Sequence, residues 1–196
     1  MKKASQILLL SLVASTAWFC GTRNDNQATR ENEQNGNSAP VSMREAVDPN
    51  MEGEVLALVA QVDKNEIAAA KEAENEKMSQ AAIDYAKMLR EAHDNNLEMT
   101  KKISRDINID LNKTSEVDML EDKGDALMNK LKQLDGKQFE MAYIDAMIQG
   151  HTEALNMIDN KLMKNAKNDM VISHLTETRK HVAMHLDEAK RLKNNM

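Results

Sequence analysis

The stretch from Asp145 to Ile158, DAMIQGHTEALNMI, decides the fold because its apolar residues recur at helical spacing. Ile148, Leu155 and Ile158 fall on one face of an α-helix, as expected for a helix that buries one stripe against a core. His151 lies on the same stripe, three residues after Ile148, where a leucine would be expected. The stretch therefore predicts a core-facing helix that carries one buried histidine.

Amphipathic segments of the same kind follow Pro49, the second and last proline of the chain. Four long helices are expected, at 52–75, 79–108, 138–165 and 169–193. A shorter helix is expected over 116–135, with Ser115 as its candidate N-cap. Because helices with one apolar stripe bury it best against one another, we predict an all-α fold class. The predicted architecture is an antiparallel four-helix bundle with a short extra helix between helices two and three.

The N-terminal residues have the pattern of a secretory signal. Lys2 and Lys3 precede an apolar run over 7–19, which is too short to span a bilayer as a stable helix. We therefore expect residues 1–19 to be a signal peptide. Cys20, the only cysteine, follows directly, and this layout resembles that of a bacterial lipoprotein acylated at the cysteine. The alternative is ordinary cleavage after Ala17, which would leave a free thiol.

The next segment contains little that could be buried. Asn, Gln, Ser, Gly and charged residues dominate it, so we predict a disordered tether over 20–50 and a folded helical domain over 51–196. The expected location is the cell envelope: a periplasmic protein anchored through its lipid, with the outer membrane favoured. The membrane is then the expected partner.

Composition argues against a nucleic-acid partner. The formal net charge is −6, and removal of the predicted signal with its two lysines would make it more negative by two. Aromatic residues make up only 3% of the chain, so platforms for base stacking are scarce. The core must be built from aliphatic residues and from some of the fifteen methionines.

Each predicted long helix carries one ionisable residue on or beside its apolar stripe: Glu66, His93, His151 and His185. A single buried histidine is more often a hydrogen-bonded core residue than a ligand. Four such groups that converge need partners, because each unpartnered group costs about 1–3 kcal/mol. Three imidazoles and a carboxylate suit a divalent transition metal, so we predict a metal site; a metal-free, hydrogen-bonded core is the alternative.

The expected heights of these residues along their helices support the site in part. His151 and His185 lie at similar distances from a turn near Lys167, whereas Glu66 and His93 are unequally spaced about the turn near Lys77. The site could therefore use three of the four residues, or the four could form two separate polar spots.

Other candidates carry weaker signals. His181 and His185, spaced i and i+4, could chelate a metal from one helix face, but an exposed, solvated His181 is equally expected. Met147 and Met184 lie near histidines, which is compatible with copper, but filling of the core is favoured for both. His174 is expected at the surface.

Three segments resemble a known family. They are KNEIAAAKEAENEKMSQAAIDYAKMLREAHDNN at 64–96, GKQFEMAYIDAMIQGHTEAL at 136–155 and HLDEAKRL at 185–192. Together they resemble the domain of unknown function 4142 family, secreted bacterial proteins often labelled outer-membrane proteins. The resemblance implies a ferritin-like bundle and includes all four candidate site residues. The chain has Ala92 where family members commonly have Asp, and Lys180 where a proline is often found.

The sequence favours a binding or structural role over catalysis. None of the five histidines has a Glu three residues before it, which argues against the Glu-x-x-His pairs of di-iron bundles. The chain has no glycine-rich phosphate loop and no arrangement suited to serine or cysteine catalysis. The first hypothesis is a lipid-anchored, metal-binding envelope protein. The alternatives are a structural or interaction protein without metal, and a metal-dependent oxidoreductase.

Overall fold

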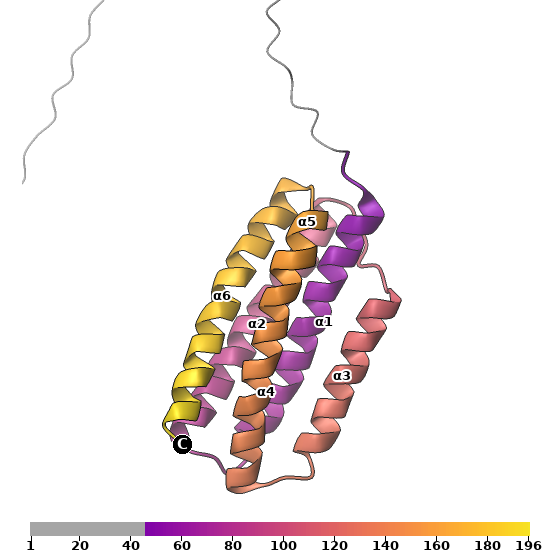
Figure 1. Cartoon of the computed structure of the whole chain (residues 1–196). Helices are drawn as coiled ribbons and strands as arrows, with labels where there is room; N and C mark the ends of the chain where they lie inside the picture. The colour runs from indigo at the N-terminus through magenta and orange to yellow at the C-terminus, as the bar shows by residue number, and fades with distance from the viewer. Residues whose placement is uncertain (1–45) are drawn as a thin grey trace, which may run out of the picture. The chain divides into compact units, whose positions relative to one another are not determined.

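The computed structural model describes residues 46–196, and every regular element in this part of the chain is helical (Figure 1). The elements are α1 (Pro49–Glu74), α2 (Gln80–Asp106), α3 (Ser115–Leu131), α4 (Gly136–Met157), η1 (Ile158–Leu162), α5 (Met163–Asn165) and α6 (Asp169–Asn194). The predicted all-α class is confirmed. The predicted signal peptide, Cys20 and most of the predicted tether lie outside the described residues.

None of the helices between residues 46 and 196 is both long enough and apolar enough to cross a bilayer.

Short polar side chains cap the beginnings of four helices, as expected for residues that satisfy exposed backbone amides. The caps are Asp48 for α1, Ser79 for α2, Thr114 for α3 and Asn168 for α6. Thr114, whose hydroxyl accepts a hydrogen bond from the Val117 amide at 3.4 Å, therefore takes the capping role expected for Ser115. α1 begins at Pro49, two residues before the expected start of the domain, because Pro suits the first helical turn.

The third predicted long helix is interrupted by a π-helical turn. α4 continues through η1 into α5, so the segment 136–165 stays helical with one wider turn near its end. A π-turn inserts a residue into the helical repeat and so rotates the residues that follow it. Hydrophobic periodicity alone did not indicate this turn.

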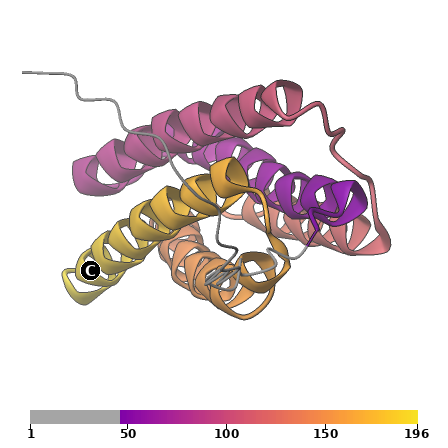
Figure 2. The same cartoon turned by 90° about the horizontal axis from the view of Figure 1, so that it is seen from above.

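The helices pack in pairs. α1 lies against α2, and α4 lies against α6, while α2 and α6 also touch. α3 packs mainly on α1, on the side away from α6 (Figures 1 and 2). The result is a helical bundle-like fold.

α3 approaches α1 closely because Gly124 has no side chain. A Cβ at Gly124 would collide with the side-chain amide of Asn65 on α1. That amide is fixed: Asn65 Nδ2 donates to the Leu120 carbonyl at 2.7 Å, and Asn65 Oδ1 accepts from Gln61 Nε2 at 2.9 Å. α3 is therefore held by a backbone contact and a polar network, with few buried side chains of its own.

The core of the described residues has two large apolar clusters with a polar layer between them. The first cluster contains Leu56, Ile158 and Leu175, and the second contains Leu89, Phe139 and Tyr143 among others. On each long helix the residues of the two clusters are separated by a buried polar group. These groups are Asp63 and Glu66 on α1, His93 on α2, His151 on α4 and His185 on α6.

Replacement of Gly124 tests the close contact between α1 and α3. We expect Gly124→Ala to lower the free energy of unfolding by about 1–3 kcal/mol, the usual cost of an added methyl in a tight contact. Alanine's better helix propensity, worth about 1 kcal/mol, would otherwise stabilise α3. Urea unfolding followed by circular dichroism measures the change. With Asn65→Ala in the same chain the two costs should not add, and a stabilising Gly124→Ala would contradict the contact.

Candidate metal centre

Three histidines from three helices meet in the polar layer. One ring nitrogen each of His93, His151 and His185 lies within 4.8 Å of the others. The three side chains are 4%, 1% and 5% exposed, and their ring centroids lie 5.3–5.9 Å apart. A metal held at about 2.0–2.1 Å in tetrahedral geometry separates its ligand atoms by roughly 3.4 Å, so small side-chain rotations would close the set around one ion.

His93 is oriented by a buried carboxylate on α1. His93 Nδ1 lies 2.8 Å from Asp63 Oδ1, and Asn96 Nδ2 donates to Asp63 Oδ2 at 2.9 Å. Asn96 is itself held by α6, because its Oδ1 accepts from Thr178 Oγ1 at 2.9 Å. The ring orientation of His93 therefore depends on a network that joins α1, α2 and α6. A carboxylate behind a histidine is the usual outer partner of a metal-bound imidazole.

His151 is oriented by its own helix. Its Nδ1 lies 2.7 Å from the Met147 carbonyl, which only accepts hydrogen bonds, so Nδ1 carries the hydrogen and Nε2 keeps a lone pair. The backbone of His185 is fixed by Tyr85, whose hydroxyl donates to the His185 carbonyl at 3.0 Å.

Burial keeps two of the three rings neutral. Burial lowers the pKa of His151, and the nearby Glu66 charge only partly opposes it. Burial, together with the neighbouring histidines, lowers the pKa of His185 to about 3. Burial also disfavours the charged form of His93, but the hydrogen bond to Asp63 and the charges of Glu66 and Asp63 outweigh it and raise the pKa of His93. Neutral imidazoles are the form that binds metal ions.

The nitrogens that remain have no hydrogen-bond partner. Within 46–196, only six buried side-chain N or O atoms are unpartnered: His93 Nε2, His151 Nε2, His185 Nδ1, Glu66 Oε2, Tyr143 Oη and Glu52 Oε2. Three of the six belong to the three converging rings. Donor atoms of the kind that a transition metal prefers thus lie together, and the residues present fit a metal ion.

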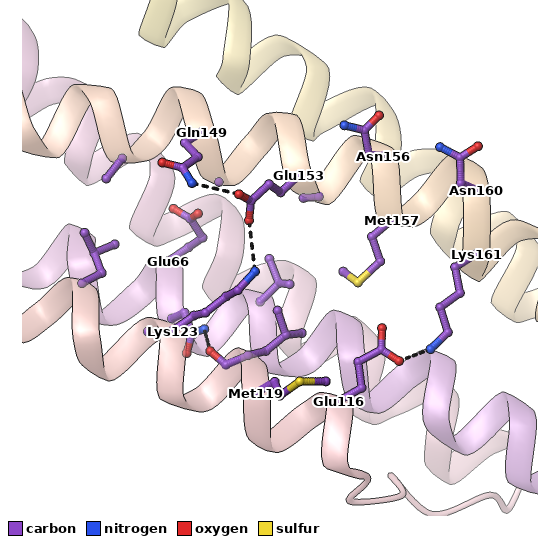
Figure 3. Close-up of a pocket in the computed structure, with 18 residues that line it drawn as sticks. Glu66, Glu116, Met119, Lys123, Gln149, Glu153, Asn156, Met157, Asn160 and Lys161 are labelled. Carbon is purple, nitrogen blue, oxygen red and sulfur yellow. Dashed lines mark hydrogen bonds and ion pairs between the residues drawn. The ribbon is translucent and has the colours of Figure 1, made fainter.

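Glu66 lies beside this group and faces a groove. It is buried but falls outside the set of atoms within 4.8 Å of one another. It lines a groove of about 830 Å³ between α1, α3 and α4, together with the Lys123–Glu153 ion pair (Figure 3). A Cβ at Gly150 would lie 3.0 Å from Glu66 Oε1, so the glycine leaves room for the carboxylate.

The other expectations from the sequence differ in outcome. His174, expected at the surface, is buried, and its Nε2 is hydrogen-bonded to Thr100 Oγ1 at 2.8 Å because the α2–α6 interface covers it. His181 is exposed, as one of its two interpretations required. Met147 fills the core as expected, whereas Met184 is exposed and does not.

Two functional candidates were missed in the sequence. Asp63 follows Val62 and so lies just off the apolar stripe of α1, where periodicity gives it no weight. Distance from the turn near Lys77 could have identified it. Asp63 and His93 lie at more nearly equal distances from this turn than Glu66 and His93 do, so Asp63 is expected at the height of His93. Tyr143, eight residues before His151 and hence on the same helix face, has an unpartnered buried hydroxyl. Burial and the nearby Glu66 charge raise the pKa of Tyr143.

The fold and site define an all-helical protein with a buried three-histidine centre. The family model described as "Domain of unknown function (DUF4142)" matches residues 37–192, and the chain belongs to this family. The match includes α1 to α4 entirely and all three histidines. No curated protein and no solved structure matches the chain.

Two substitutions in metal-free protein test which buried polar groups have hydrogen-bond partners. His185→Leu should leave the free energy of unfolding unchanged or raise it, because it removes an unpartnered buried nitrogen. Asp63→Ala should lower it by about 1–3 kcal/mol, because His93 and Asn96 lose their acceptor. Chemical denaturation with a chelator present measures both. An equal loss in the two variants would show that His185 has a partner in solution.

Proposed function

We propose that this protein binds one divalent transition-metal ion through His93, His151 and His185. The observation that carries the proposal is the set of three unpartnered imidazole nitrogens, contributed by three helices and buried at one level of the core. Imidazole ligands suit Zn²⁺, Cu²⁺, Ni²⁺ and Fe²⁺, and not Mg²⁺ or Ca²⁺, which prefer oxygen.

The surrounding residues divide the work of holding the ion. Asp63 would orient His93 and increase its basicity through Nδ1, and the Met147 carbonyl does the same for His151. Glu66 supplies a nearby negative charge and is the candidate for a fourth ligand, directly or through water. Three protein ligands leave a position for water or an exchangeable ligand, where a bound ion would act as a Lewis acid.

We further propose a ferritin-like, antiparallel four-helix bundle with α3 as the added helix, carried by a lipid-anchored protein of the bacterial envelope. The pairing of α1 with α2 and of α4 with α6 supports the bundle. Lys2, Lys3, the apolar run over 7–19 and Cys20 support export and lipidation. In this proposal the domain that holds the metal centre lies in the periplasm and not in the cytoplasm.

Elemental analysis of untagged protein tests the metal. After incubation with Zn²⁺ and removal of the excess, we expect about one ion per chain, as three converging imidazoles would bind. His151→Leu should lose the ion. Saturation of the wild-type protein to 100 times Kd should stabilise it by about 2.7 kcal/mol, an effect that the variant should lack.

His174→Leu is the matched control for that experiment. It removes another buried histidine, but Thr100 keeps its hydrogen bond to the Asn96 carbonyl at 3.0 Å, so no buried group is left unpartnered. The control should therefore bind Zn²⁺ as the wild type does. If wild-type protein holds no metal and gains no stability from any of the four ions named above, the structural or interaction role without metal becomes the better hypothesis.

Lipidation at Cys20 has its own test. In a bacterial host the mature N-terminal peptide should begin at Cys20 and carry acyl chains, which mass spectrometry of the membrane fraction detects. Cys20→Ser should move the protein to the soluble fraction, because the lipid is the proposed anchor. A mature chain that begins at Trp18 with an unmodified Cys20 thiol would instead establish ordinary signal cleavage.

A further inference from the structure

A second groove, between α2 and α6, is lined in part by one histidine of the three-histidine centre. Its volume is about 690 Å³, and its lining includes Ala92, Asn96, Met99, Met170, His181 and His185. His185 belongs both to this lining and to the centre. The groove therefore reaches one of the proposed metal ligands.

The groove is also linked to a second proposed ligand, His93, through Asp63. Asn96 lines the groove and donates to Asp63, which in turn holds His93. The groove between α1, α3 and α4 differs, because its lining contains Glu66 but none of the five histidines. Of these two grooves, only the one between α2 and α6 leads to imidazole nitrogens.

The wall of the α2–α6 groove offers metal ligands from the surface inward. His181 is exposed and lies four residues before His185, so the two side chains share one face of α6. The thioethers of Met99 and Met170, 48% and 43% exposed, flank the same groove. Imidazole and thioether together select late or borderline transition metals over Mg²⁺ and Ca²⁺.

The charges along the groove favour a cation. The acidic side chains in its lining are Asp106, Asp169 and Glu177, against one basic side chain, Lys102. Lys102 is paired with Asp106, and Glu177 accepts from Lys180 at 2.7 Å, so the attraction is moderate. An excess of acidic over basic side chains along a groove raises the local concentration of cations and their rate of entry.

We propose that the α2–α6 groove is the entry route for the metal, and that His181 with His185 forms a transient capture site along it. The inference rests on the proposed metal-binding function. A hydrated dication cannot enter a dry core in one step without a large desolvation cost. At the capture site the His181 and His185 nitrogens would replace two waters of the hydrated ion. His93 and His151 would then replace His181 and further waters, which would bury the ion.

The kinetics of metal loading test the route. The probe is Co²⁺, added to untagged apoprotein in a stopped-flow instrument and followed by its visible absorption. His181→Ala should slow loading by roughly tenfold, at the low end of what local charge and ligands contribute to entry rates. Release to a chelator should slow by the same factor, because a residue on the path changes both rates and leaves the affinity unchanged. His181→Glu, which restores a ligand atom, should recover most of the rate.

A steric variant and a control complete the experiment. Ala92→Leu leaves every proposed ligand in place but narrows the groove, so it should slow loading and release equally. Met184→Ala alters an exposed α6 side chain outside the groove lining and should load at the wild-type rate.

Wild-type rates in both His181→Ala and Ala92→Leu would overturn the route while leaving the metal site intact. A loss of affinity in His181→Ala would make His181 a permanent ligand and overturn its transient role. If the wild-type protein binds neither Co²⁺ nor any of the four ions named under the proposed function at equilibrium, both this inference and the proposed function fall.

Discussion

Three imidazole nitrogens without hydrogen-bond partners, buried in one layer, are the constraint on which the rest of this structure depends. Each unsatisfied buried polar group costs about 1–3 kcal/mol, and a domain is stable by only about 5–15 kcal/mol. His93, His151 and His185 together would therefore consume a large part of the stability of the fold. His174 shows that the same helices can satisfy a buried histidine with a hydroxyl. The three rings lack such a partner, and a metal ion held by all of them, as proposed, would satisfy them together.

The apolar clusters on either side of the polar layer set its geometry. Because each long helix contributes to both clusters, a helix cannot slide or rotate without opening a cavity in one of them. Hydrogen bonds between helices also orient the site: Asp63 and Asn96 orient His93, and Tyr85 holds the backbone at His185. The nitrogens are thus placed by packing, before any ligand arrives, which lowers the cost of ordering the site upon binding.

The hydrophobic periodicity of the sequence predicted the features that depend on a single helix. It located the long helices to within a few residues and identified all three histidines, because each interrupts an apolar stripe of its own helix. It could not locate Asp63, whose role depends on how α1 is rotated against α2, nor the burial of His174, which depends on how closely α2 and α6 pack. The π-turn η1 was missed because one wider turn barely changes the spacing of apolar residues. A pattern along one chain does not show how its helices pack against one another.

Charge balance explains why Glu66 belongs with the centre although it lies outside the closest group of atoms. Neutral imidazoles contribute no net charge, so an ion in the dry layer must be balanced by neighbouring acids. Asp63 and Glu66 are the two buried carboxylates of the layer, and ionised they carry two negative charges, which match a divalent cation. A trivalent ion would leave an excess positive charge in the core. Without metal, the two carboxylates are balanced at most in part, and they raise the pKa of His93. The same pair of acids therefore favours a proton on His93 when the site holds no metal, and it would compensate a divalent ion bound there.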